Sequence, residues 1–248
     1  MSFVLQALGI LFTILTFFFL GKLVDATKAS SMLNVRGGYF TFVLIGIAVS
    51  NYISVASRSY ADRLREAQLT GTLEAMMMTP TPVGQIVIFS TIYDFLFASM
   101  RVAVYIGIGA AFFGLDVSNA RWGWALLFLL ISIIAFSSIG IISAAFIMMF
   151  KRGDPLATVL NTASFLFSGV YYPVEVLPGW LQWVSAALPM TWALRGLRAA
   201  ISPTPGGGNL LTEALILILF SAVLWPVSLA VFSMAVKKSR KDGTLGKF

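Results

Sequence analysis

The 248-residue chain is 58% hydrophobic and only 11% charged, and its mean hydropathy is +0.90. Soluble domains contain roughly 45–50% apolar residues, so this composition indicates an integral membrane protein. The net charge of +7 comes mostly from loops and the tail, which fits the positive-inside rule better than nucleic-acid binding. The sequence has no cysteine and no histidine, which excludes thiol chemistry, a cysteine or histidine zinc site and a histidine base.

Six apolar runs predict six membrane-spanning helices, because a helix needs roughly 20 residues to cross a bilayer. The first run begins almost at Met1, without a basic region or an A-x-A cleavage site, so we expect a retained span and not a signal peptide. The expected fold class is an all-α integral membrane protein with one transmembrane domain over residues 1–248. Its predicted spans are residues 3–20, 39–55, 83–113, 122–150, 155–172 and 210–236.

The longest polar interval between apolar runs covers residues 58–82, between the second and third predicted spans. Within it, the stretch from Asp62 to Met78 has the mixed charges and partly apolar side of a surface helix, which predicts a helix outside the bilayer. Pro80 and Pro82 then end the helix. We interpret the segment as a docking helix for a partner. The alternative is an ordinary solvated loop that joins two spans.

The third apolar run contains two charged residues, Asp94 and Arg101. Counted from Val83 at 1.5 Å per residue, Asp94 lies roughly 16 Å and Arg101 roughly 27 Å along the helix. This predicts Asp94 near mid-bilayer, where an ionisable residue indicates a functional site, with Arg101 as a possible partner. Arg101 can also extend to the far interface. The alternative for Asp94 is a position inside the bundle, bonded to Ser90 or Tyr93.

The segment 173–208 differs from the other connections. Its two apolar pieces, Gly179–Leu188 and Met190–Ile201, are each too short to cross, and Pro189 separates them. We predict a re-entrant or interfacial helical hairpin, which requires other protein or water to satisfy its backbone.

Charged side chains in this hairpin are candidates for the lining of an exit path. They are Glu175, Arg195 and Arg198, and Trp192 lies among them. For each charged residue taken singly, a solvated position is the simpler interpretation.

An even number of spans places both termini on one side of the membrane. Ten of the 17 Lys and Arg residues fall in segments on the side of the basic tail, against six in the opposite loops. The positive-inside rule therefore predicts cytoplasmic termini, and it places the 58–82 segment in the cytoplasm as well.

The sequence contains no G-x-x-x-x-G-K-[ST] motif, so energy for active transport would come from another polypeptide or from an ion gradient. Clustered carboxylates are also missing. The sequence therefore predicts no catalytic residues and no metal site.

The motif Thr70-Gly71-Thr72-Leu73-Glu74, followed by Met78-Thr79-Pro80, resembles the cytoplasmic segment of ABC type-2 exporter permeases. Its position after two spans and the Tyr-Pro and Leu-Pro steps within residues 171–189 add to the resemblance, which covers nearly the whole chain. The resemblance implies that the 58–82 segment is a coupling helix seated on a separate ATPase. The expected ATPase-coupling residues are Arg65, Glu66, Thr70, Gly71, Thr72, Leu73 and Glu74, and the expected translocation-path residues are Asp94, Arg101, Glu175, Trp192 and Arg195.

The resemblance also implies partners and a location. Two ATPase subunits would bind ATP and Mg²⁺, with no cofactor in this chain, and a second permease copy would complete a homodimer or close heterodimer. The cargo would be a lipid, a lipid-linked glycan or a hydrophobic drug, moved across the cytoplasmic membrane of a prokaryote. Such permeases usually carry an interfacial helix before the first span, where this sequence has only Met1 and Ser2. The alternatives are a stand-alone channel or secondary transporter with Asp94 in its pathway and, third, a membrane-embedded transferase.

Overall fold

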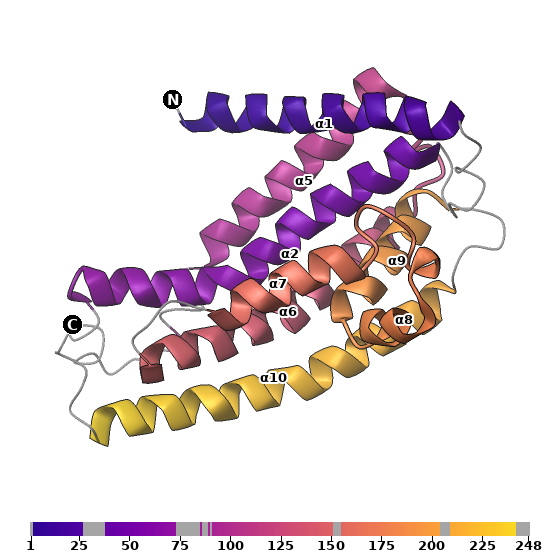
Figure 1. Ribbon diagram of the computed structural model, residues 1–248. Helices are drawn as coiled ribbons and strands as arrows, with labels where there is room; N and C mark the ends of the chain where they lie inside the picture. Colours follow the sequence, from indigo (N-terminus) through magenta and orange to yellow (C-terminus); the bar gives the residue numbers. More distant parts are fainter. Residues whose placement is uncertain are drawn as a thin grey trace.

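The computed structural model describes residues 2–26, 38–72, 85, 89, 91–150, 155–203 and 209–241, and within them the regular structure is entirely helical. Figure 1 shows long helices lying side by side, with two short helices clustered at one end. The elements are α1 (Ser2–Ala26), α2 (Gly38–Leu69), α5 (Ile92–Phe113), α6 (Trp122–Phe150), α7 (Pro155–Phe167), the 3₁₀ helix η2 (Val174–Val176), α8 (Gly179–Ala186), α9 (Pro189–Ile201) and α10 (Leu210–Lys241).

Four of these helices are long and apolar enough to cross a membrane: Gly38–Ala67, Ile92–Phe113, Trp122–Met149 and Leu210–Lys238. They coincide with four of the predicted spans, and the chain is a multi-pass membrane protein. α1 and α7 overlap the other two predicted spans, 3–20 and 155–172, and contribute the shorter apolar helices Leu8–Leu23 and Thr158–Phe167.

The core lies where α2, α6 and α9 meet, and α10 runs along α6 on the other side (Figure 1). The first half of α2 is almost completely buried, as expected for a helix surrounded by others. α1 crosses the Gly38 end of α2 and is held there by aromatic contacts of Phe18 with Phe40 and Phe113. The residues that are at most 2% exposed include Val43, Leu44, Ile45, Phe128, Phe136, Leu194 and Leu197.

α2 is longer than a membrane span. Its 32 residues extend roughly 48 Å, against roughly 30 Å of bilayer hydrocarbon. The polar residues 58–69 therefore continue α2 past the bilayer instead of starting a new helix.

The predicted helix from Asp62 to Met78 is wrong in its limits. α2 ends at Leu69, and Gly71 follows with a left-handed φ of 70°. Glycine adopts this conformation without the steric penalty of other residues, so it ends a helix. The Thr70 amide and hydroxyl both donate to the carbonyl of Glu66, at 2.9 and 2.8 Å, which satisfies an acceptor in the last turn. Residues 73–84 lie outside the described residues.

Two short helices occupy the region of the predicted hairpin, with Pro189 at the start of α9. The side chain of Ser185 donates to the carbonyl of Phe167 at 2.5 Å, and Thr191 donates to the carbonyl of Ser185 at 2.6 Å. The Trp192 indole donates to the carbonyl of Ala186 at 2.8 Å. Thr191 and Trp192 therefore satisfy backbone carbonyls at the end of α8, and Ser185 satisfies a carbonyl at the end of α7.

Candidate functional site

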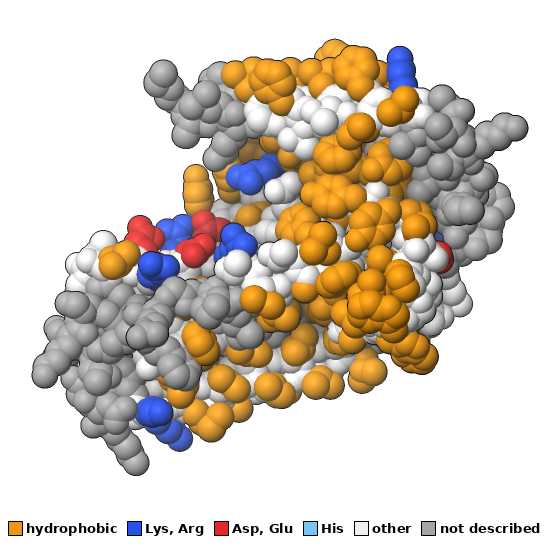
Figure 2. Space-filling model, viewed as in Figure 1, with side chains coloured by type: hydrophobic (Ala, Val, Ile, Leu, Met, Phe, Trp, Pro, Cys, Tyr) orange, Lys and Arg blue, Asp and Glu red, His pale blue; other side chains and the backbone are white. Residues whose placement is uncertain are grey.

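A groove of about 440 Å³ opens between α2 and α5, toward the Leu69 end of α2. α2 contributes a polar stripe at helical spacing, formed by Asn51, Ser54, Arg58, Asp62 and Glu66. Residues separated by three or four positions lie on one face of a helix, so the sequence itself builds this stripe. Figure 2 shows the charged side chains gathered in a hollow bordered by hydrophobic surface.

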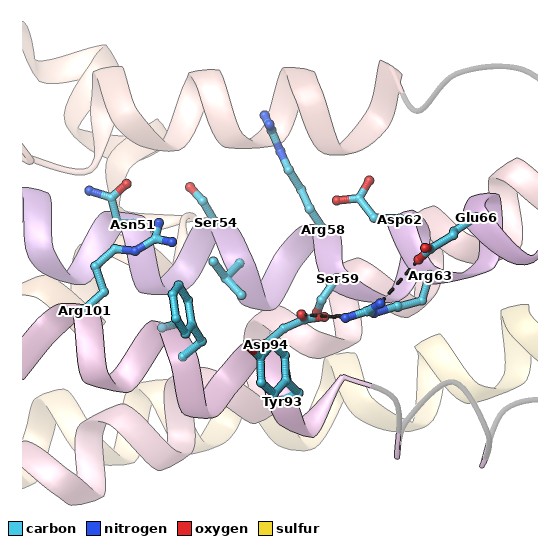
Figure 3. Close-up of a pocket in the computed structure, with 13 residues that line it drawn as sticks. Asn51, Ser54, Arg58, Ser59, Asp62, Arg63, Glu66, Tyr93, Asp94 and Arg101 are labelled. Carbon is cyan, nitrogen blue, oxygen red and sulfur yellow. Dashed lines mark hydrogen bonds and ion pairs between the residues drawn. The ribbon is translucent and has the colours of Figure 1, made fainter. Parts of the chain in front are cut away.

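α5 forms the opposite wall with its first turns. Tyr93, Asp94, Phe97 and Arg101 line the groove at the same kind of spacing. The wall thus alternates aromatic and charged side chains, and Figure 3 shows Asp94 and Arg101 extending toward α2.

An ion pair joins the two walls. Arg63 Nη2 lies 2.8 Å from Asp94 Oδ1, and Arg63 Nε donates to Asp94 Oδ2 at 3.2 Å (Figure 3). The two side chains are 34% and 24% exposed, so the pair is partly shielded from water. Arg63 Nη1 also lies 3.3 Å from Glu66 Oε2. The paired geometry is the strong, oriented form of an arginine–carboxylate contact.

The expected partner of Asp94 was wrong. Asp94 pairs with Arg63 and not with Arg101. It lies in the first turn of α5, where a carboxylate is favoured by the helix dipole. Counted from Gly38, Arg63 is roughly 37 Å along α2. The register between α2 and α5, which sequence does not supply, decides this pairing.

Arg101, which was expected to extend to the far interface, lines the groove from α5. Its side chain reaches toward Asn51 across the groove, and its guanidinium carbon lies 5.6 Å from the centroid of Phe97 (Figure 3). Arg101 is seven residues further along α5 than Asp94, which corresponds to roughly 10 Å along the helix axis.

The expected coupling residues lie at the projecting end of α2. Arg65 and Glu66 are exposed in its last turns, and Thr70, Gly71 and Thr72 form the exposed turn that follows. The hydroxyls of Thr70 and Thr72 are 3.0 Å apart. This end therefore offers a hydrogen-bonding surface to a partner.

Two of the expected coupling residues, Leu73 and Glu74, lie outside the described residues.

The expected translocation residues form two separate groups. Arg195 Nη2 lies 2.9 Å from Glu175 Oε1, and its guanidinium carbon is 5.6 Å from the Trp192 ring centroid. This group lies in the hairpin at the Gly38 end of α2 (Figure 1), whereas Asp94 and Arg101 line the groove toward the Leu69 end.

Arg198 is not solvated as expected. It is only 7% exposed, its Nε donates to the carbonyl of Phe42 at 3.2 Å, and its Nη2 donates to the carbonyl of Val170 at 3.1 Å. Its position between Leu194, Leu197 and Ile201 on the apolar side of α9 is the sequence signal that indicates burial.

The part of the chain that the structure describes contains no group of three or more carboxylate, histidine or cysteine side chains placed to hold a metal ion. The arrangement instead offers a charged groove, a projecting helix end and a hairpin. These features suit binding and mechanical coupling.

Comparison with known proteins agrees with this arrangement. The profile described as "ABC-2 type transporter" matches residues 1–202. The chain is similar to ABC transporter G family member 36 of Oryza sativa subsp. japonica, with 25% identity over 173 residues, 69% of this chain and 11% of that protein. It is also similar to the inner membrane transport permease YadH of Escherichia coli strain K12, with 22% identity over 163 residues, 64% of this chain and 62% of the permease.

A third similar protein is the uncharacterized protein YhgE of Bacillus subtilis strain 168, with 29% identity over 161 residues, 61% of this chain and 20% of that protein. The chain thus spans between about a tenth and three fifths of the length of the relatives it matches. Since the profile match covers most of the 248 residues, the chain belongs to the ABC-2 type transporter family.

Proposed function

We propose that this chain is the membrane-spanning permease subunit of an ABC exporter. It moves a lipid, a lipid-linked glycan or a hydrophobic drug out of the cytoplasm, and a separate ATPase subunit binds ATP and Mg²⁺ and hydrolyses the nucleotide. Two permease copies, as a homodimer or close heterodimer, surround the path with two ATPase subunits in the cytoplasmic membrane of a prokaryote. Family membership supports the transport role.

The Arg63–Asp94 ion pair is the observation that carries the coupling part of the proposal. α2 is continuous from its buried half to its projecting end, and this end presents Arg65, Glu66 and the Thr70–Thr72 turn. The ion pair fastens the same stretch to the first turn of α5. A displacement of the projecting end by the ATPase would therefore move α2 and α5 together.

The proposed topology has six spans with both termini in the cytoplasm. α1 and α7 serve as the two shorter spans, and α8 and α9 form a hairpin that enters the membrane and returns to the outer side. α9 has 13 residues, as α7 does, but it carries Arg195 and Arg198, which would lie in hydrocarbon if α9 crossed, whereas α7 contains no charged residue. The hydrogen bonds from Ser185, Thr191 and Trp192 support a hairpin at membrane depth, because they satisfy carbonyls that water cannot reach there.

A charge-swap experiment tests the coupling. The chain is co-purified with the P-loop ATPase encoded beside it, and ATP hydrolysis is measured in proteoliposomes of the host's lipids. Arg63→Asp and Asp94→Arg should each lower the rate by roughly fivefold, equivalent to about 1 kcal/mol, because each places like charges together. The double variant, with the charges exchanged, should recover most of the rate.

Arg121→Asp is the matched control, since Arg121 is exposed just before α6, away from the projecting end of α2, and does not line the groove. Equal rates of ATP hydrolysis in both single variants and the wild type would show that the ion pair takes no part in coupling. Failure of the chain to bind any P-loop ATPase would remove the proposed function itself.

A further inference from the structure

The α2–α5 groove contains two arginines that no described carboxylate neutralises. Arg63 is engaged by Asp94 and Glu66, whereas Arg58 and Arg101 form no ion pair with any carboxylate that the structure describes. Arg58 is exposed and Arg101 is half-buried. Both guanidinium groups therefore remain available to an anion inside the groove.

The depth of Arg101 makes its charge costly without a ligand. Counted from Gly38, Arg58 is roughly 30 Å along α2, at the edge of the hydrocarbon, and Asn51 is roughly 10 Å further inside. Figure 3 shows Arg101 extending toward Asn51, which places its guanidinium at hydrocarbon depth. An arginine within the hydrocarbon is unfavourable on insertion scales, and such a residue marks a functional site by default.

The groove is amphipathic in the way a lipid is. Phe97 and Val55 line it beside the charged side chains. On the lipid-facing side of α5, Ile92, Leu96 and Met100 are 52–70% exposed. An acyl or polyprenyl chain can lie against this apolar surface while its headgroup enters the groove. The volume of about 440 Å³ falls within the roughly 300–1,000 Å³ of small-molecule sites.

We propose that this groove binds the phosphate-containing headgroup of an anionic amphiphile from the cytoplasmic leaflet. The guanidinium groups of Arg58 and Arg101 contact the phosphate oxygens, because the arginine fork matches phosphate geometry. Asn51 and Ser54 offer amide and hydroxyl groups to the rest of the headgroup. That this amphiphile is the transported cargo rests on the proposed function. That it binds in the groove does not depend on the proposed function.

The order of charges along the groove favours a lipid over a free phosphate compound. At the Leu69 end three carboxylates, of Asp62, Glu66 and Asp94, outnumber the one guanidinium of Arg63 among the groove-lining residues, so an anion arriving from the cytoplasm first meets net negative charge. An anion arriving sideways from the bilayer passes the apolar face of α5 and meets Arg101. The arrangement therefore admits an anionic headgroup from the membrane side.

The test measures lipid retention on the purified full-length chain, without ATP or any partner. Native mass spectrometry in mild detergent compares phosphatidylglycerol with a glucosyl-diacylglycerol of identical acyl chains, which lacks phosphate. The wild-type chain should retain phosphatidylglycerol preferentially. Arg58→Gln and Arg101→Gln should each weaken that binding by roughly tenfold, because each removes a charge-assisted contact. Arg101→Lys should retain part of it, and Arg65→Gln should bind as the wild type does.

Competition experiments distinguish a lipid headgroup from a free phosphate compound. Inorganic phosphate and glycerol 3-phosphate, added at the concentration of the lipid, should not displace phosphatidylglycerol. Displacement by either would overturn the lipid assignment in favour of a free phosphate compound. Wild-type lipid binding by both glutamine variants would overturn the site.

A second measurement serves if a glutamine variant cannot be purified. Ser54→Cys provides a single cysteine in the groove, since the chain has none of its own. Phosphatidylglycerol should protect this cysteine from maleimide, and the glucosyl lipid should not. Equal labelling with both lipids would overturn the site. If the chain binds the lipid but stimulates no ATPase, the proposed function is wrong and the proposed binding site is still supported.

Discussion

Arg198 and Phe42 are 156 positions apart in the sequence, yet the guanidinium carbon of Arg198 lies 3.5 Å from the centroid of the Phe42 ring. The same side chain donates to the backbone carbonyls of Phe42 and Val170. A single buried cation thereby joins α9, the beginning of α2 and the chain that follows α7. Its partners are two carbonyls and an aromatic face, and no carboxylate in the part of the chain that the structure describes forms an ion pair with it.

Replacing Arg198 should destabilise the protein strongly. Arg198→Ala leaves two buried carbonyls without this donor and removes the ring contact, at a cost of about 2–4 kcal/mol. The control is Arg195→Ala, whose ion pair with Glu175 is exposed and should contribute less than about 1 kcal/mol. Thermal unfolding in detergent, followed by tryptophan fluorescence, measures both variants. Similar melting temperatures for the two would contradict the assigned role of Arg198.

Gly46 gives Arg198 and its neighbours the space they occupy. A Cβ atom at position 46 would lie 2.4 Å from the carbonyl oxygen of Val170 and 2.6 Å from Arg198 Nη2. Gly46→Ala should therefore lower stability by about 1–3 kcal/mol through overpacking. Gly107→Ala on α5, where a Cβ would meet nothing within 4 Å, should instead stabilise its helix by roughly 0.5–1 kcal/mol. The same unfolding assay compares them, and a neutral Gly46→Ala would show that this contact can relax.

Much of the helical framework could be predicted from the sequence because apolar length is a local property. The runs 122–150 and 210–236 coincide with α6 and α10, the run 39–55 covers the first half of α2, and Pro189 marks the start of α9. The sites were harder to predict because they depend on how helices are placed against one another. Asp94 was expected at mid-bilayer from its own run, but the register of α5 against α2 places it beside Arg63.

The end of α2 shows a second reason why the sequence did not predict the site fully. Nothing between Val55 and Leu69 breaks a helix, so α2 continues through the change from apolar to polar residues. A change in hydropathy was taken as a boundary, although it marks only where the helix leaves the bilayer. The resemblance of Thr70-Gly71-Thr72 to a coupling motif indicated the correct region, but it gave no sign that Gly71 is left-handed and follows the last turn.

The left-handed Gly71 gives a test of the coupling turn. Gly71→Pro fixes φ near −65°, which is incompatible with the observed value of 70°, so the turn must rearrange. We expect loss of ATPase stimulation in the co-purified complex with normal membrane insertion, because the turn lies outside the candidate span Gly38–Ala67.

Gly71→Asn is the matched control for this experiment. Asparagine tolerates the left-handed region better than other non-glycine residues, so the variant should keep most of the stimulation. Stimulation equal to that of the wild type in Gly71→Pro would show that the turn does not transmit the effect of ATP hydrolysis.

The side on which the hairpin ends decides the topology. The amide of Arg121, just before α6, donates to the carbonyl of Ala200 in α9 at 2.7 Å, and Arg198 contacts the first turns of α2. These contacts place the end of α9 at the Gly38 end of the bundle. Arg195, one turn earlier in α9, forms an ion pair with Glu175 at 2.9 Å. A seven-span alternative would instead carry α8 and α9 across the membrane, with the two hairpin arginines in hydrocarbon at about 2.5–3.5 kcal/mol each.

Single-cysteine labelling in intact cells separates these topologies, since the native chain contributes no background. Glu175→Cys and Asn209→Cys should both react with an impermeant maleimide from outside, because both positions are exposed and lie on either side of the hairpin. Ser239→Cys, in the basic tail, should react only after permeabilisation, because the positive-inside rule holds that tail in the cytoplasm. Labelling of positions 175 and 209 from opposite sides would overturn the six-span topology. The projecting end of α2 and the basic tail would then lie on opposite sides of the membrane. If the tail stayed in the cytoplasm, an ATPase could not reach the projecting end of α2.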